Sequence, residues 1–436
     1  MKTLYLVCRE GLSAVFPSMV LAPIAALQRR GVEVELAVLS PVGQLMRGSG
    51  RERWQRLTEE AREHYGVTMT LLPSAPTRAR WLWSDLRVVR RWVARRCGDG
   101  AEPLVLHCRG PYAASMGLAL KEWFPQLRVI FDMRGITFAE NLLVRGLPDA
   151  DELEQSLDAE TQAIYDMEMR VATEADGVIC VATSVAEWLQ PRCEVDAGTL
   201  RVVLNPVDAA QFKADAAHRD AVRKQIGAAG RFVVCYCGSL REWQQHERGV
   251  ELFVMLQREM PDAFFLGVTT SPDQMRASLR AAGVAERDFA VVQVPYHEVG
   301  RYLAAADLGL ITRGLGRPPR LEDRLSCPVK FAEYLAAGTP VVLGPEIGDC
   351  SRIATEEGVG LVLSPHEAEP QQVLAAYAQR VADDRQAIAD TCRQVAHRHH
   401  DLEQVAERIS DLYRVLARQA ARKTFRTLDG CAAEGN

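Results

Sequence analysis

The stretch SCPVKFAEYLAAGTPVV, residues 326–342, decides the fold that we expect. Its first half, 328–337, is rich in helix-forming residues and follows a Ser and a Pro. Gly338 then leads into the β-branched pair Val341 and Val342. The pattern predicts a helix, a glycine stop and a buried strand.

Two charged residues lie close together at the start of this helix. Lys330 and Glu333 are three positions apart, so they share one helix face. Unpaired backbone N–H groups at a helix start favour phosphate, Lys330 adds positive charge, and Glu333 can accept hydrogen bonds from ribose hydroxyls. The stretch therefore indicates a nucleotide diphosphate site. An amphipathic helix with two solvated charges explains this stretch equally well.

Length and composition exclude several classes of protein. A chain of 436 residues favours two domains, and 48% hydrophobic with 25% charged residues is typical of a soluble globular protein. The net charge of -5 argues against general nucleic-acid binding. No apolar run reaches the roughly 18–20 residues of a membrane span. The opening MKTLYLVCRE lacks a cleavage site, so we interpret it as a first strand.

Cysteine usage favours a protein with reduced thiols in a cytoplasm and gives little support for a metal site. The 11 Cys are an odd number in apolar contexts, which is typical of reduced thiols in a cytoplasm. Cys235 and Cys237 form C-x-C, which is neither a redox nor a zinc pair. A surface metal site at His397, His399 and His400 remains a minor alternative.

Strands and helices alternate along both halves of the chain. A strand at 3–8, a helix at 19–30 and a strand at 32–39 form a β-α-β unit, which requires a parallel sheet. An Asn-Pro break within 201–212 predicts the interdomain linker, and the alternation restarts at Phe232. No G-x-G-x-x-G follows the first strand, which argues against an NAD-dependent oxidoreductase.

Polar residues follow two successive strands of the first half. His107 and Arg109 stand at the end of one strand, and Asp132 and Arg134 at the end of the next. Functional residues of open α/β sheets collect at the carboxyl ends of strands. These four residues therefore predict a cleft.

Two further segments are rich in arginine. Residues 77–96, TRARWLWSDLRVVRRWVARR, carry seven Arg against one Asp, with Trp81, Trp83 and Trp92 interleaved. Such a helix can lie on an anionic membrane or hold a lipid-linked phosphate, or it can pack one face on a core while the other is solvated. The Gly/Pro/Arg loop 313–325 offers arginines for phosphates.

Together these segments resemble family-4 glycosyltransferases of the GT-B fold. The resemblance rests on PVKFAEYLAAGTPVV, the preceding AAADLGLI, the linker VVLNPVDAAQF and ADGVICVATSVAEWL, spread in family order over roughly residues 105–365. It implies an α/β protein with two Rossmann-like doubly wound domains facing across a cleft. The expected parts are an acceptor-binding domain at 1–205, a nucleotide-sugar domain at 206–400, a helix returning to the first domain at 401–424 and a disordered tail at 425–436.

The resemblance also implies roles for individual residues. Glu333 matches the second glutamate of the family's paired motif, which holds the ribose, whereas Leu325 occupies the place of the first. Glu322, Asp323 or backbone groups are candidates to replace that first glutamate. The residues expected to bind the diphosphate and nucleotide are Gly238, Ser239, Arg241, Arg248, Lys330 and Glu333, with Trp243 and Gln244 as neighbours. His107 matches a histidine near the reacting carbon, and Gly11, Arg109, Asp132 and Arg134 are expected on the acceptor side.

The function implied is a retaining, metal-independent glycosyltransferase with a UDP- or GDP-type sugar donor and no cofactor. Its catalytic residues would be His107, Lys330 and Glu333, and we interpret Asp149 and Asp151 as solvated rather than as a metal-binding D-x-D. The acceptor expected is a saccharide or lipid-linked oligosaccharide of bacterial surface polysaccharide synthesis, with contact to the inner membrane face through 77–96. A GT-B nucleotide-sugar epimerase and a catalytically weak GT-B scaffold remain alternatives.

Overall fold

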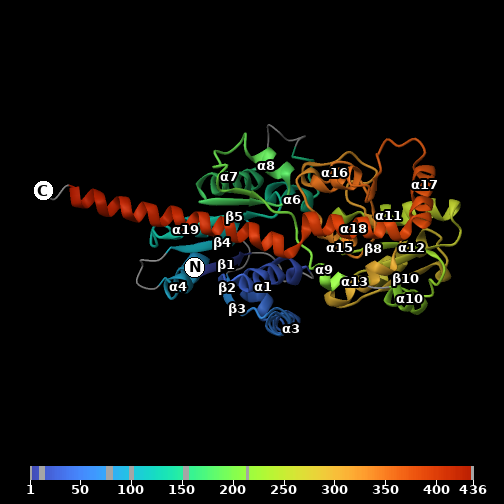
Figure 1. The fold of residues 1–436 in the computed structure, drawn as a ribbon, viewed down its shortest axis with the longest axis horizontal. Helices are drawn as coiled ribbons and strands as arrows, with labels where there is room; N and C mark the ends of the chain where they lie inside the picture. Colours follow the sequence, from blue (N-terminus) through green and yellow to red (C-terminus); the bar gives the residue numbers. More distant parts are fainter. Residues whose placement is uncertain are drawn as a thin grey trace. The chain divides into compact units, whose positions relative to one another are not determined.

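The computed structural model describes residues 2–8, 15–74, 82–97, 103–150, 157–212 and 216–433, with side chains except at 44, 45, 82, 83, 216 and 421–433. The chain folds into two units (Figure 1). Unit 1 comprises Met1–Arg145, Leu153–Val203 and Glu403–Asn436, and unit 2 comprises Gly146–Glu152 and Leu204–Leu402. Gly11 and residues 77–81 of the sequence analysis lie outside the described residues.

Unit 1 is built on a seven-stranded parallel sheet with the strand order β3-β2-β1-β4-β5-β6-β7. The strands are β1 Lys2–Cys8, β2 Glu33–Pro41, β3 Met69–Ser74, β4 Leu104–Arg109, β5 Leu127–Met133, β6 Gly177–Cys180 and β7 Leu200–Val202. The helices are the π-helical turn η1 Pro17–Leu21, α1 Ala22–Arg29, α2 Val42–Leu45, α3 Gly48–Tyr65, α4 Leu82–Ala94, α5 Pro111–Leu120, α6 Thr137–Val144, α7 Ala159–Glu174, α8 Thr183–Leu189 and α19 Leu402–Ala433.

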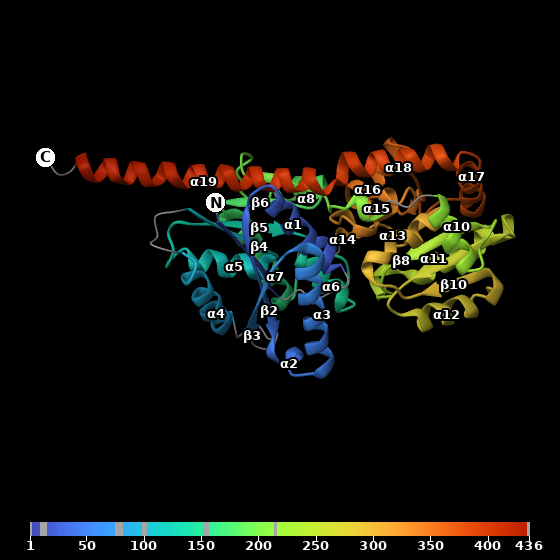
Figure 2. The ribbon, with the colours of Figure 1, turned by 60° about the horizontal axis from the view of Figure 1, so that its bottom comes forward.

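Helices cover both faces of this sheet. Gly117 of α5 packs so closely that a Cβ there would lie 2.9 Å from Sγ of Cys108. His107, the next residue on β4, instead contacts Tyr413 of α19. Because neighbouring side chains on a strand point to opposite faces, α5 and α19 lie on opposite faces of the sheet, as Figure 2 also shows. Unit 1 is therefore doubly wound, as the alternation predicts.

Unit 2 repeats the architecture with a six-stranded parallel sheet in the order β10-β9-β8-β11-β12-β13. The strands are β8 Phe232–Cys237, β9 Ala263–Val268, β10 Phe289–Val292, β11 Leu308–Ile311, β12 Val341–Leu343 and β13 Gly360–Val362. The helices are α9 Ala209–Phe212, α10 Ala216–Gln225, α11 His246–Glu259, α12 Pro272–Ala281, α13 Tyr296–Ala305, α14 Leu321–Arg324, α15 Val329–Ala336, α16 Gly348–Glu356, α17 Pro370–Asp383 and α18 Arg385–His400, with 3-10 turns at Glu242–Gln244 and Glu286–Asp288. The predicted α/β class is confirmed.

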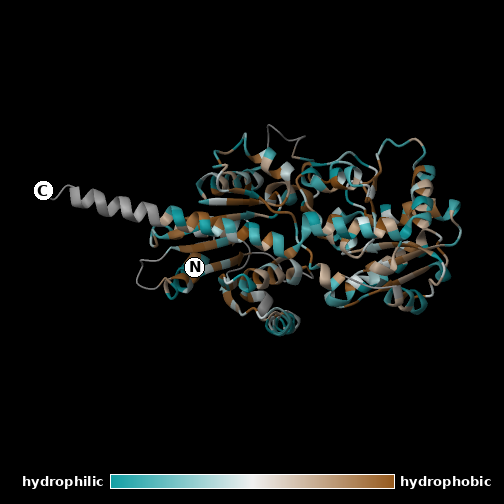
Figure 3. Ribbon diagram, in the orientation of Figure 1, coloured by the Kyte–Doolittle hydropathy of each residue, from teal (hydrophilic) through white to brown (hydrophobic). Residues whose placement is uncertain are grey.

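The stretch that opened the sequence analysis adopts the predicted conformation. Helix α15 spans Val329–Ala336, Gly338 has a φ of +77°, and β12 is buried. A φ in the left-handed region is where glycine costs least, so Gly338 ends the helix and lets the chain turn into the sheet. Figure 3 shows the apolar strands lying between helices with hydrophilic outer faces.

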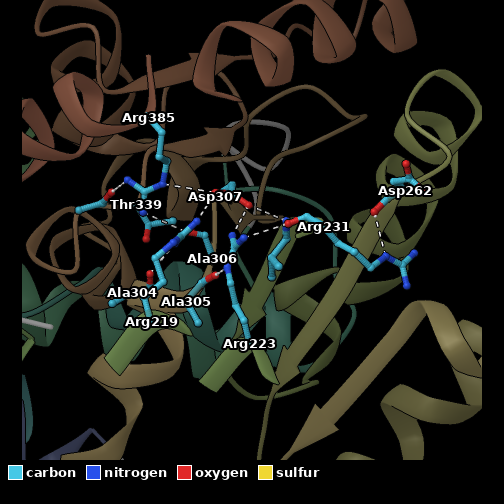
Figure 4. Close-up of polar contacts among 12 residues, drawn as sticks. Arg219, Arg223, Arg231, Asp262, Ala304, Ala305, Ala306, Asp307, Thr339 and Arg385 are labelled. Atoms are coloured by element: carbon cyan, nitrogen blue, oxygen red, sulfur yellow. Dashed lines mark hydrogen bonds and ion pairs between the residues drawn. The ribbon is translucent and has the colours of Figure 1, made fainter. Parts of the chain in front are cut away.

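A buried carboxylate holds the amino end of the unit 2 sheet together (Figure 4). Asp307 precedes β11 and is only 6% exposed. Arg219 and Arg223 of α10 and Arg385 of α18 all pair with it, and its carboxylate also accepts a hydrogen bond of 2.7 Å from the backbone N–H of Val233. The same arginines donate to backbone carbonyls, among them those of Ala304, Ala305 and Ala306. This cluster is fully engaged in fixing α10 and α18.

Several elements differ from the sequence-based expectation. Helix α7 begins at Ala159, because Asp158 caps it by accepting from the Thr161 N–H. Helices α6, α9 and α10 were not predicted. The helix expected to return to the first domain is α19, which joins unit 1 from Glu403 onward and extends to Ala433, overlapping the predicted tail.

Candidate functional site

The strongest candidate site lies at the carboxyl end of β8 in unit 2. Gly238 follows the last residue of β8 with a φ of +140°, and a Cβ on it would come within 3.1 Å of the Lys330 Nζ. Only glycine therefore lets the chain pass so close to the ammonium group. The sequence singled out both residues, and the structure brings them together.

Lys330 is held without a carboxylate partner among the described residues. Its Nζ donates to Oε1 of Gln244 at 2.7 Å and lies 5.1 Å from the centre of the Tyr236 ring. Burial lowers the pKa of Lys330 to about 8, and the positive charge of Arg313 acts in the same direction. A cation held only by an amide and an aromatic face keeps its charge available for an anion.

Glu333 lies one helical turn beyond Lys330 and is 5% exposed. Tyr296, the first residue of α13, donates to Oε1 of Glu333 at 2.9 Å. Burial raises the pKa of Glu333 to about 7, although the Tyr296 hydrogen bond and the charge of Lys330 oppose the rise. A carboxylate and an ammonium group with opposite pKa perturbations, side by side, are typical of a functional site.

The other predicted phosphate-binding residues surround this pair less closely. Ser239 accepts a hydrogen bond from Tyr236 through its carbonyl, at 2.7 Å. Arg241 is exposed and stacks on Trp243, with 5.1 Å between the guanidinium carbon and the ring centre. Arg248 pairs with Glu251 at 2.6 Å and packs against Gly316. Within the described residues no contact joins either arginine to Lys330.

The structure also places the candidates for the missing first glutamate. Residues 313–325, the donor loop, end at the buried Leu325. Asp323 is fully buried, lies 3.3 Å from Nε of Arg313 and 2.7 Å from Nη1 of Arg317, and accepts from the Arg320 N–H. Glu322 is 3% exposed and pairs with Arg320 at 2.7 Å. Both carboxylates therefore form ion pairs within the loop.

One acidic residue was misjudged from the sequence. Asp149, interpreted as solvated, is 8% exposed and accepts a hydrogen bond from the backbone N–H of Leu321. The expectation was wrong because the partner is 172 positions away, so no local signal reveals it. Asp151 lies outside the described residues.

The predicted strand-end cluster of unit 1 exists, but it is closed. His107 is 1% exposed, stacks on Tyr5 at 4.2 Å between ring centres and bonds to the Tyr413 hydroxyl through Nδ1 at 2.8 Å. Its Nε2 lies 3.2 Å from Oδ2 of Asp132. Both ring nitrogens of His107 thus already face a partner.

Asp132 is the centre of this unit 1 cluster. Burial disfavours its charge, yet Arg134 at 3.3 Å, together with His107 and Arg109, outweighs that cost and holds the pKa of Asp132 well below its usual range. Tyr5 also donates to this carboxylate at 3.3 Å. The cluster joins β1, β4, β5 and, through Tyr413, α19. Tyr413 has no sequence signal that could have revealed its role.

Helix α4, in the arginine-rich segment, has one face packed in the core and one face that is exposed and basic. Trp92 of α4 is 3% exposed, so it belongs to the core and not to an aromatic membrane face. Arg87, Arg91 and Arg95 are exposed at four-residue spacing, and Arg90 lies 4.9 Å from the ring centre of the half-exposed Trp123. The exposed face is therefore cationic. In the described part of the chain no helix is long and apolar enough to cross a membrane.

The three neighbouring histidines do not converge. His397 bonds to Asp401 at 3.0 Å, and His399 to Glu357 at 3.2 Å. His400 is buried, its Nδ1 bonds to the carbonyl of Asn205 at 2.8 Å, and burial lowers its pKa to about 4. No group of His, Cys, Asp or Glu among the described residues is arranged to hold a metal ion.

Comparison with known proteins gives the same fold. Residues 19–211 match the family model described as Glycosyltransferase Family 4, which covers less than half of the chain and excludes the 326–342 stretch. No curated protein sequence matches the chain.

Solved structures resemble the chain over nearly its whole length. Anabaena HepE in complex with UDP superposes with a TM-score of 0.66 at 17% identity, covering 95% of this chain and 100% of that one. WaaG, a glycosyltransferase involved in lipopolysaccharide biosynthesis, gives 0.62 at 14% identity, covering 94% and 99%. A putative UDP-N-acetylglucosamine 2-epimerase from Listeria monocytogenes gives 0.57 at 12%, covering 94% and 95%.

At such identities structural likeness shows the fold and not the activity. The predicted architecture of two Rossmann-like domains is confirmed by the two parallel sheets and by these neighbours. The chain has the GT-B fold, and the matched model supports a family-4 glycosyltransferase.

Proposed function

We propose that the protein transfers a sugar from a nucleotide diphosphate-sugar to an acceptor with retention of configuration. The observation that carries the proposal is the approach of Gly238 to the Lys330 ammonium group, beside the buried Glu333. A diphosphate needs a cation and a backbone that allows close contact, and a ribose needs a hydrogen-bond acceptor. The complexes of HepE with UDP and UDP-glucose support the same class of donor.

The chemical task is to let the nucleotide diphosphate leave the sugar carbon. Negative charge grows on the leaving oxygen, and Lys330 lies where it can stabilise that charge without a metal ion. The Gln244 amide fixes the ammonium position, since it accepts from Nζ at 2.7 Å. The described carboxylate beside Lys330 is Glu333, which accepts from Tyr296 and which we assign to the ribose, so we favour attack from the same face that the diphosphate leaves.

The acceptor-side residues take a supporting role in this proposal. His107 remains a predicted catalytic residue, and its contacts with Asp132 and Tyr413 favour orientation over direct proton transfer. Arg109, Arg134 and Asp132 then fix the strand ends on which an acceptor saccharide would rest.

A cytoplasmic location with contact to an anionic membrane face fits a lipid-linked acceptor of surface polysaccharide synthesis. The cationic face of α4 supports this part, because Arg87, Arg91 and Arg95 are like charges at helical neighbour positions and repel one another in isolation. Sedimentation with vesicles rich in anionic lipid tests it. We expect retention at low salt that is lost in the triple glutamine variant; equal retention of both proteins would remove the membrane contact.

A GT-B nucleotide-sugar epimerase is the second candidate, which the Listeria neighbour supports. Calorimetric titration with UDP, GDP and CDP, without metal and then with Mg²⁺, tests the donor site itself. We expect one diphosphate to bind without metal and Glu333→Ala to abolish that binding. Absence of binding for every nucleotide would overturn the proposal in favour of a scaffold. Nucleotide release from the UDP-sugar in the absence of any acceptor would favour the epimerase.

A further inference from the structure

A short segment between α6 and α7 belongs to unit 2 through its contacts. Residues 146–150, which we name the strap, follow the last residue of α6 in unit 1 by two positions. In unit 1, Nη2 of Arg145, the residue before the strap, pairs with Oδ2 of Asp158 at 2.7 Å. The strap therefore follows directly on an ion-paired residue of unit 1 but makes its own contacts within unit 2.

The strap binds the donor loop through polar contacts to its backbone and side chains. Both carboxylate oxygens of Asp149 accept from the Leu321 N–H, at 3.3 and 3.2 Å. The carbonyl of Leu147 accepts from Nη2 of Arg320 at 3.2 Å. Asp149 and the next residue, Ala150, are each 8% exposed. A buried ionised side chain is retained only where its hydrogen bonds compensate for lost hydration.

Besides the ion pairs of Asp323 and Glu322, the donor loop has little regular secondary structure to fix its course. Gly314 and Gly316 have φ values of +73° and +76°, and Pro318 and Pro319 offer no N–H. Its single helical element, α14, has four residues. Asp323 accepts from the Arg320 N–H, and Asp149 accepts from the next N–H, that of Leu321. Two carboxylates, one from the loop and one from the strap, therefore satisfy the start of α14.

A short series of contacts connects the donor loop to Lys330 in the nucleotide site. Arg313 pairs with Asp323, and its charge acts on Lys330. At the other end of the loop, Oγ of Ser326 donates to the Asp323 carbonyl at 2.8 Å, four residues before Lys330. A shift of α14 would move Asp323. It would therefore displace Arg313 before α14 and Ser326 after it, ahead of α15.

We propose that the strap positions the donor loop, with Asp149 as a positioning residue for nucleotide diphosphate binding at Lys330. This inference rests on the proposed function. It assigns to a segment that follows the acceptor-side strand β5 a role in the donor site, and it explains why a carboxylate is buried in a short Pro-containing turn. Asp149 touches no reacting atom, so its effect reaches the ligand through Leu321 and the loop.

The test is calorimetric titration of the full chain with the nucleotide diphosphate that the wild-type protein binds. We expect Asp149→Ala to raise the dissociation constant about 10-fold, because it removes a buried charge-assisted hydrogen bond. Asp149→Asn keeps an acceptor oxygen for the Leu321 N–H and should recover most of the affinity. Where transfer can be assayed, KM for the donor should rise more than kcat falls.

A matched control is Asp196→Ala, since the Asp196 carboxylate also accepts from a backbone N–H, that of Gly198 at 2.8 Å, but is exposed in unit 1. It should bind like the wild type. Equal affinity of wild type, Asp149→Ala and Asp149→Asn would overturn the inference while leaving the proposed function intact. Absence of binding by the wild type would instead remove the proposed function. If Asp149→Ala does not fold, Asp149→Asn against Asp149→Glu decides: a longer side chain should displace α14 and weaken binding.

Discussion

Each unit carries a polar cluster next to its central strands, and the two clusters differ in how their charges are used. In unit 1, the carboxylate of Asp132 lies beside Arg109, Arg134, His107 and Tyr5, so its charge is paired within the cluster. In unit 2, the described contacts of Lys330 are with an amide and an aromatic ring, and no described carboxylate forms an ion pair with it, although the charge of Glu333 acts on it. A buried carboxylate held by ion pairs specifies structure, whereas a cation that forms no ion pair within the described residues is available to an anionic ligand.

The largest effect expected is on the stability of unit 1. Asp132 is the carboxylate with which Arg109, Arg134 and His107 pair. Asp132→Asn removes its charge and should lower the free energy of unfolding by about 3–5 kcal/mol. Thermal unfolding followed by calorimetry measures the loss. Asp411→Asn in the exposed pair with Arg414 is the control and should change stability by about 0–1 kcal/mol. A variant as stable as the wild type would mean that the unit 1 cluster is not structural.

The next effect is on catalysis in unit 2. Lys330→Met should lower kcat by about 10²–10³, because it removes a preorganised cation from the leaving group. Stability should change little, because the described contacts of Lys330 are one side-chain hydrogen bond and one ring contact. Lys224→Met, on the exposed side of α10, should leave kcat unchanged. A Lys330→Met enzyme with wild-type kcat contradicts the contrast between the clusters.

A smaller effect separates stability from binding at Glu333. Its pKa is raised from 4.5 to about 7 in the folded protein, so between these pH values the folded state binds more protons than the unfolded state. Stability from this group is complete below pH 4.5 and is lost as pH rises through about 7. Glu333→Gln should therefore stabilise the protein at pH 8 by on the order of 1–3 kcal/mol while weakening nucleotide binding. Denaturant titration at pH 5 and pH 8 measures the first effect; a variant less stable at both values would contradict it.

The smallest effect is the pH dependence of nucleotide binding. Lys330 has a pKa of about 8, so it loses its charge above that pH in the free protein. Affinity for the diphosphate should fall toward about 10-fold per pH unit above pH 8, because binding requires the ammonium form. Titrations from pH 6.5 to 9.5 measure the slope. Lys330→Arg should flatten it, and an unchanged slope in that variant would assign the titration to another group.

The features that the sequence could predict are those that depend on residues close together in the chain. The helix, glycine and strand of 328–342 depend on neighbouring residues, so periodicity and Gly338 sufficed. The start of α7 also depends on a local signal, because Asp158 is its N-cap. Lys330 was singled out by its position at the helix start and Gly238 by the family resemblance, and the structure showed how closely they approach.

The rest depends on partners far along the chain. Tyr413 meets His107 across 306 positions, and Asp149 meets Leu321 across 172. Nothing in the residues around Asp149 distinguishes a buried carboxylate from a solvated one. The same limit explains His107, whose place at a strand end predicted an open site although α19 covers it.

The most direct test of the contrast is a parallel titration of the nucleotide diphosphate into wild type, Lys330→Met and Asp132→Asn at pH 7 without metal. The account predicts that Lys330→Met loses binding while remaining stable, and that Asp132→Asn keeps binding while losing stability. Retained binding by Lys330→Met, or lost binding by a folded Asp132→Asn, would contradict the assignment of the donor site to unit 2.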